Sequence, residues 1–168
     1  MKSFILTAAL FFIATVTFLS CNKAEKSVPV QFLLTDAPAS YESVNVHLVG
    51  IKVKMHSDDG SWTSLDAKDT IINLLDLQNG VTTLIAQGNV PEGILKEVRF
   101  ILGSDNTIVS NGVTYDLETP SAEHSGLKIK IDKQLGETLN TFTLDFDAFL
   151  SIKEENGGYK LLPVIKLK

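Results

Sequence analysis

Two aspartates offer the clearest metal chemistry in this chain. Asp145 and Asp147 alternate with three apolar residues, a period-two pattern that predicts a strand. Residues two apart on a strand point to the same face, with Cα atoms about 7 Å apart, and paired carboxylates favour a bound cation or one raised pKa. Oxygens from Asp36, Asp105 and Asn106 could complete a Ca²⁺ site. The alternative is a solvated face on which both aspartates oppose lysines of a neighbouring strand.

Aromatic residues suggest a different kind of site. Trp62, Tyr115 and Tyr159, together with Tyr41, could form a stacking platform for sugar rings. A domain made of packed sheets also needs aromatic anchors, so we expect Trp62 to be buried in the core. An exposed pair among these aromatics would instead favour ligand binding.

The sequence contains no convincing catalytic residue. Ser121, His124 and Ser125 are neighbours in a polar loop, whereas a hydrolase nucleophile needs a sharp elbow and an oxyanion hole, and no GxSxG motif occurs. His47 and His56 lack metal-ligand spacing, so we expect both at the surface. We therefore expect a protein that is not an enzyme and that needs no cofactor.

The N-terminus resembles a lipoprotein signal. Lys2 gives it a positive charge, and residues 4–19 are apolar and uncharged. This stretch is shorter than the roughly 18–20 residues that a helix needs to cross a bilayer, and it matches the apolar region of a secretion signal. It ends in Phe18-Leu19-Ser20-Cys21, which is similar to a lipobox. We therefore predict a lipoprotein signal peptide over residues 1–20.

In proteins with such a signal, the cysteine carries a thioether-linked diacylglycerol and, after cleavage, an N-acyl chain. The resemblance implies the same for Cys21, and two or three acyl chains make membrane attachment effectively permanent. Residues 21–27 would then be the lipidated cysteine and a short tether. Asn22 follows in place of the Asp that resembles an inner-membrane retention signal, which favours the outer membrane. The alternatives are an ordinary signal peptide with a chance cysteine, or an uncleaved anchor.

Composition excludes several classes of function. The 168 residues carry a formal net charge of −5 and a pI near 5.1, which argues against nucleic-acid binding because that requires a basic face. The single cysteine excludes an intramolecular disulfide, a cysteine-based zinc cluster and a CxxC redox pair.

The remaining chain, residues 28–168, predicts one all-β domain. Apolar residues alternate with polar ones, turn signals such as Asn111-Gly112 and 156–158 separate them, and no long helical period occurs. We expect a two-sheet antiparallel β-sandwich in which residues 159–167 form one last strand, placed at an edge or bulged because Pro163 lacks a donor.

The segment from Val44 to Met55 carries a more specific signal. Val44, Val46 and Leu48 share one parity, while Ile51, Val53 and Met55 have the other. A regular strand would turn the second apolar set to the opposite face. Gly50 lies between the two sets, so we predict a β-bulge there that returns both sets to the core. The alternative is two strands joined by a sharp bend.

Several short sequence segments resemble those of an uncharacterised domain of bacterial lipoproteins, which is catalogued as a domain of unknown function. They include Leu34-Thr35-Asp36-Ala37-Pro38, residues 74–80, Val90-Pro91-Glu92-Gly93-Ile94 and Leu162-Pro163-Val164-Ile165. The Pro91-Glu92-Gly93 turn is also similar to prealbumin-like and carboxypeptidase-regulatory sandwiches. The resemblance implies a prealbumin-like or immunoglobulin-like fold and an envelope location, and it supplies no catalytic or ligand-binding residues.

Together these observations favour a lipid-anchored cell-envelope protein whose sandwich binds a glycan or protein ligand. One alternative is a structural subunit of a surface assembly, in which an edge strand such as 159–167 pairs with a partner by strand addition. A further alternative is a metal-assisted hydrolase that uses the Asp145 and Asp147 face.

Overall fold

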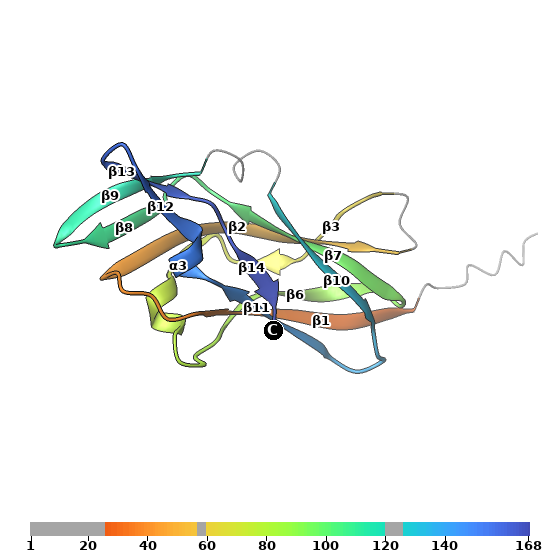
Figure 1. The fold of residues 1–168 in the computed structure, drawn as a ribbon. Coiled ribbons are helices and arrows are strands. Elements are labelled where there is room, and N and C mark those ends of the chain that lie inside the picture. Colours follow the sequence, from red (N-terminus) through yellow and green to blue (C-terminus); the bar gives the residue numbers. More distant parts are fainter. Residues whose placement is uncertain (1–25, 57–59, 120–125) are drawn as a thin grey trace, which may run out of the picture.

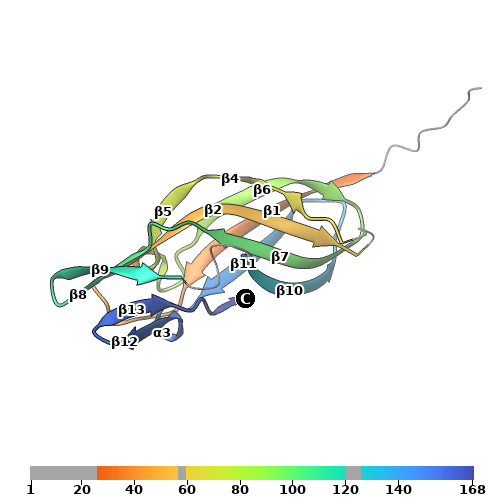
Figure 2. The same ribbon diagram turned by 90° about the horizontal axis from the view of Figure 1, so that it is seen from above.

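The structure is a computed structural model that describes residues 26–56, 60–119 and 126–168. Within these residues the chain forms two β-sheets packed face to face, with two single-turn helices, η1 (Leu74–Leu77) and α3 (Ala148–Ser151) (Figure 1; Figure 2). The all-β sandwich expected from the alternating pattern is confirmed.

The smaller sheet has five strands with β1 at its centre. Its order is β14 (Ile165–Leu167), β11 (Asn140–Phe146), β1 (Ser27–Asp36), β6 (Thr83–Pro91) and β4 (Asp66–Ala67). The β1–β11 pair is parallel, so the sheet is mixed rather than purely antiparallel. This pairing places Phe32 opposite Phe142, whose rings stack with centroids 5.3 Å apart.

The larger sheet has nine strands and is organised by the long strand β2. Its main path is β10 (Leu127–Gln134), β7 (Ile94–Leu102), β2 (Ser43–Met55), β8 (Thr107–Ser110), β9 (Val113–Glu118), β13 (Gly158–Leu161) and β12 (Ile152–Glu155). The strands β7 and β8 pair along one edge of β2, and the strands β3 (Thr63–Ser64) and β5 (Thr70–Asn73) pair along its other edge. The strands β8, β9, β12 and β13 lie at the end of the sandwich opposite the start of β1 (Figure 1).

The core lies between the sheets and is built from the inward residues of both. Phe32 and Leu34 of β1 are fully buried, as are Phe100 of β7 and Phe146 of β11. Phe100 and Phe146 meet edge to face across the two sheets, with ring centroids 6.1 Å apart. Burying each such side chain stabilises the fold by roughly 1.5–3 kcal/mol.

The bulge predicted in β2 is present. The pairing of β2 with β7 shifts register between Leu48 and Gly50, and Val49 is left 40% exposed. Because of this shift, the apolar residues on both sides of Gly50 are buried against the same core.

Two tight turns lie where the sequence predicts them. Asn111 and Gly112 both have positive φ values, 52° and 72°, as a type I′ turn between β8 and β9 requires. Asn156 and Gly157, at 54° and 77°, close the β12–β13 hairpin in the same way. The sequence Asp58-Asp59-Gly60 also predicts a hairpin turn, and this turn lies largely outside the described residues.

The expectation of one last strand over 159–167 is wrong. The segment divides into β13, which belongs to the larger sheet, and β14, which belongs to the smaller one. Residues 162–164 connect them and are not in a strand. Pro163 lies in this connection, where its missing N–H costs no ladder hydrogen bond.

Candidate functional site

Trp62 lies on the outer face of the larger sheet. It precedes β3, and its ring meets Arg99 of β7, whose guanidinium carbon lies 4.1 Å from the ring centroid. Thr63 pairs with the inward-facing Val53, so the residue before Thr63 points outward. Trp62 is therefore only partly buried and lies outside the hydrophobic core, and the expectation that it anchors the core is wrong.

Cations from three neighbouring strands line up beside this pair. Lys52 of β2 and Lys128 of β10 both lie directly opposite Arg99. In the next row, Lys54 and Lys130 lie on either side of Glu97. We call Lys52, Lys54, Arg99, Lys128 and Lys130 the cationic face. Like charges directly opposite each other destabilise a sheet, so this row carries an electrostatic cost.

Arg99 is the central cation of this row, and no carboxylate of the described residues forms an ion pair with it. Among the described residues, Arg99, Lys52 and Lys128 form no ion pair. Within the described part of the chain, the buried Arg99 Nε has no hydrogen-bond partner. Gly126 covers the stem of Arg99 so closely that a Cβ there would lie 2.7 Å from the Arg99 Cγ. Gly126 therefore lies against the stem of Arg99, and Trp62 lies against its guanidinium.

The two predicted tyrosines lie together but do not form an open platform. Tyr115 of β9 and Tyr159 of β13 pack edge to face, with centroids 5.0 Å apart, and both are half-buried against the core. Tyr41 packs against the same core, and burial raises the pKa of its phenol. Trp62 contacts Arg99 rather than this pair. The structure thus joins Tyr115 with Tyr159 and leaves Trp62 apart from them.

The predicted aspartate pair does not share a strand face. Asp145 is only 8% exposed, and one of its carboxylate oxygens lies 3.6 Å from the Lys166 ammonium. Strand β11 ends at Phe146, so Asp147 follows the strand and instead caps α3 by accepting a hydrogen bond of 3.0 Å from the Leu150 N–H. In the part of the chain that the structure describes, no group of three or more His, Cys, Asp or Glu side chains is arranged to hold a metal ion.

Asp36 is the most perturbed carboxyl of this region. It ends β1, is 4% exposed and accepts a hydrogen bond of 2.9 Å from the Ala148 N–H. Burial raises its pKa to about 6, although hydrogen bonds from Ala148 and Gln78 favour the charged form. The nearby charges of Asp147 and Asp145 raise the pKa further. The structure therefore gathers these three carboxyls at one end of the smaller sheet.

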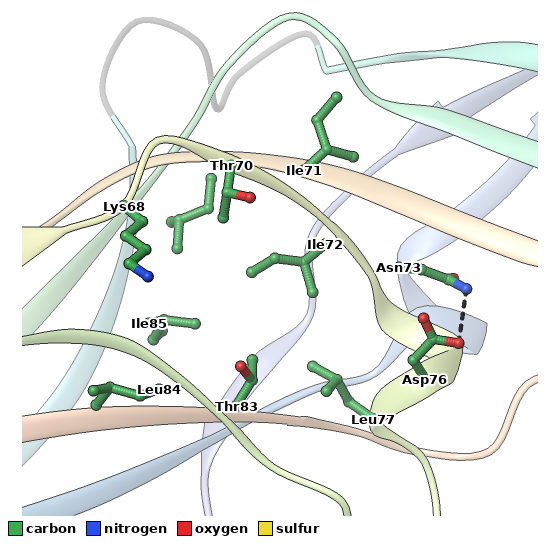
Figure 3. A pocket seen from close by; sticks show the side chains of 11 residues that line it. Lys68, Thr70, Ile71, Ile72, Asn73, Asp76, Leu77, Thr83, Leu84 and Ile85 are labelled. Atoms are coloured by element: carbon green, nitrogen blue, oxygen red, sulfur yellow. Dashed lines mark hydrogen bonds between the residues drawn. The ribbon is translucent and has the colours of Figure 1, made fainter.

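A groove opens between the two sheets along one side of the sandwich. It has a volume of about 390 Å³ and lies between β5 with η1 on one side and β6 on the other. Ile72, Leu77 and Ile85 line its interior, Lys68 stands at one mouth, and Asp76 lies toward the other, where it accepts a hydrogen bond from Asn73 (Figure 3). None of the residues that line the groove is aromatic.

Both walls of the groove present strand edges with free backbone groups. Among the described strands, β5 pairs only with β2. Thr83 and Leu84 of β6 pair with β1, and Ile85 lies at a bulge in this pairing. On the other edge of β6, β4 reaches only residues 86 and 87. Two large apolar side chains stand beside these edges, Ile71 at 54% and Leu84 at 49% exposure. Open edges and exposed apolar side chains are the features that bind an extended peptide.

The remaining predicted residues give no further site. His47 contacts Asp69 through its Nε2 at 2.6 Å and packs over Gly103, where a Cβ would overlap its ring. His56 is exposed. Cys21 and the polar loop with His124 lie outside the described residues. Within the described residues, no helix has the length and hydropathy needed to span a membrane.

The sequence reasoning missed both of the surfaces that stand out in the structure. The cationic face depends on the pairing of β2 with β7 and β10, which no local pattern specifies. The groove depends on β5 and β6 belonging to different sheets. One local signal was available, because Lys128 and Lys130 alternate with buried residues and must share an outward face.

The fold and these surfaces define an all-β, two-sheet domain with an open groove and a basic outer face. The chain belongs to the family described as Domain of unknown function (DUF4382), whose model matches residues 27–163. The resemblance to an uncharacterised domain family is thereby confirmed. No curated protein matches the chain, and no solved structure does.

Proposed function

We propose that this chain is a lipid-anchored protein of the cell envelope whose sandwich is a non-catalytic binding domain for an extended segment of another protein. Acylated Cys21 is the anchor, residues 21–27 are the tether, and the outer membrane is the location. The groove between β5 and β6 is the binding site.

The lining of the groove carries this proposal and favours a protein ligand over a glycan. Sugar rings are bound mainly by stacking on aromatic side chains, and the groove contains none. Its interior is aliphatic, its rim is polar, and both walls are strand edges with open backbone groups. An added strand could donate and accept backbone hydrogen bonds there, while every second side chain would enter the aliphatic interior.

Strand addition at the edge of β14 is less well supported than strand addition along the groove. Among the described strands, β14 pairs only with β11, so its outer edge is open. It has only three residues, Ile165–Leu167, which limits the number of backbone hydrogen bonds a partner could form. A partner strand along the groove would meet the four-residue edge of β5, the open start of β6 and exposed apolar contacts at Ile71 and Leu84.

A bead-displayed library of capped random hexapeptides tests the proposal on residues 22–168, which contain every described strand. We expect enrichment of proline-free peptides with alternating β-branched residues. Leu84→Asp should weaken binding of an enriched peptide at least ten-fold. Val113→Asp is the matched control, because Val113 is also 49% exposed but lies on β9, and it should change binding less than two-fold.

Two results would contradict the proposed site. One is that no peptide class is enriched over the beads alone. The other is that Val113→Asp weakens peptide binding as much as Leu84→Asp does. Circular dichroism of both variants checks that each retains the strand content of the parent domain.

A further inference from the structure

The charge of the sandwich is unevenly distributed. The whole chain carries a net charge of −5, yet the cationic face holds Lys52, Lys54, Arg99, Lys128 and Lys130. Glu97 lies within its rows, and Lys130 forms an ion pair of 2.8 Å with Asp132 of the same strand. Lys96 and Lys133 are exposed on the same strands. The hydrogen bond from Lys130 lowers the pKa of Asp132 at the edge of this surface, and the charges of Lys130 and Lys96 lower it further.

The opposite end of the sandwich is acidic. Strands β9 and β12 there carry exposed carboxylates at Asp116, Glu118, Glu154 and Glu155, which outnumber the two lysines of β12 and β13, Lys153 and Lys160. Lys160 forms an ion pair of 2.9 Å with Glu155. The start of β1 lies at the other end, where the Glu92 N–H donates to the Lys26 carbonyl (Figure 2). The chain therefore leaves the sandwich toward its N-terminus on the side away from this acidic end.

We propose that the cationic face, with Trp62, docks on the anionic phospholipid surface of the membrane leaflet that holds the anchor. For its location this inference rests on the proposed Cys21 anchor, but the docking itself needs only the folded domain. A tether from residue 21 to 27 spans at most about 20 Å when extended. The two sheets are about 10 Å apart, so the anchor can reach the plane of the cationic face.

The spacing of the cations favours a surface over a single small anion. Neighbouring strands are about 4.8 Å apart, and successive outward residues on one strand are about 7 Å apart. The charges therefore spread over three strands instead of converging on one point, which fits an array of phospholipid headgroups. Each cation at an anionic membrane surface contributes about a five-fold factor to binding.

Trp62 and Arg99 give the face a fixed centre. Tryptophan is enriched at membrane interfaces, where its ring is amphipathic, and Trp62 is partly exposed on this face. Its ring lies against the Arg99 guanidinium, and Arg99 forms no ion pair with any described residue. Phosphate oxygens are strong acceptors for such a planar donor group.

Vesicle co-sedimentation of residues 22–168 tests the docking without the anchor. We expect binding to vesicles with 30% phosphatidylglycerol in phosphatidylcholine, weakening as salt rises, and no binding to pure phosphatidylcholine. The double variant Lys52→Gln/Lys128→Gln should reduce binding about 25-fold. The control Lys153→Gln/Lys168→Gln removes the same charge from outside the face and should change binding less than two-fold.

Three outcomes would overturn the docking. They are equal binding to both kinds of vesicle, equal losses in the two double variants, and binding to a soluble polyanion such as heparin without binding to vesicles. A failure of the anchor is distinguishable, because it would leave the vesicle result intact while Cys21 of the full chain carried no lipid.

Discussion

The carboxyl of Asp36 predicts a pH-dependent stability that one substitution should remove. Burial raises its pKa in the folded chain to about 6 from an ordinary value of 3.8. Between these values the folded state binds more protons than the unfolded state, so the free energy of unfolding falls as pH rises. The stabilisation is fully present below pH 3.8 and is lost as pH rises through about 6.

The size of the effect follows from the two pKa values. A change from 3.8 to about 6 corresponds to at most about 3 kcal/mol. We expect about 1–2 kcal/mol, because relaxation and water penetration reduce the cost of burying a charge. Asp36→Asn keeps the oxygen that accepts from the Ala148 N–H but cannot ionise. Relative to the parent domain, this variant should therefore gain about 1–2 kcal/mol between pH 4 and pH 7.

Urea unfolding followed by circular dichroism at several pH values between 4 and 7 measures this difference. Asp116→Asn is the matched control, since it removes an exposed carboxylate of β9 and should follow the parent domain at every pH. Parallel curves for the Asp36→Asn variant and the parent domain would refute the reasoning.

Three substitutions test the packing, each by urea unfolding. Gly126→Ala should cost about 1–3 kcal/mol, because Gly126 has a φ of +67° and closely approaches Arg99. Gly136→Ala should cost under about 0.5 kcal/mol, because its Cβ would make only an ordinary contact of 3.8 Å with Asn140 Oδ1, and equal costs would contradict the close approach. Phe32→Ala should cost about 3–5 kcal/mol, because it removes the stacked ring from the core. Phe149→Ala is the control, since Phe149 is 60% exposed, and it should cost under about 0.5 kcal/mol. A small loss for Phe32→Ala would contradict the place of Phe32 in the core. Gly112→Ala should cost about 1 kcal/mol at its φ of +72°, and an unchanged stability would contradict the type I′ turn.

Local patterns predicted the parts of the fold that local physics determines. Period-two alternation identified the strands, and the parity change around Gly50 identified the bulge, because a buried face tolerates only one register. The Asn111-Gly112 pair identified a turn, because both residues must adopt positive φ. These features depend on a few neighbouring residues.

Features that depend on which strands meet were not predictable in this way. The parallel pairing of β1 with β11 joins segments more than 100 residues apart, as the Phe32–Phe142 contact shows. Asp147 looked like a strand residue because the alternation continues through it, but its carboxylate caps a helix instead. The groove and the cationic face likewise arise from distant strands brought together by the two sheets.

The state of Cys21 tests the central claim most directly. Mass spectrometry of the protein purified from its own membranes should find Cys21 as the first residue, carrying a diacylglycerol and an N-acyl chain, and Cys21→Ser should release the domain from the membrane fraction. A mature chain that begins elsewhere, or an unmodified thiol at Cys21, would contradict a lipid-anchored binding domain.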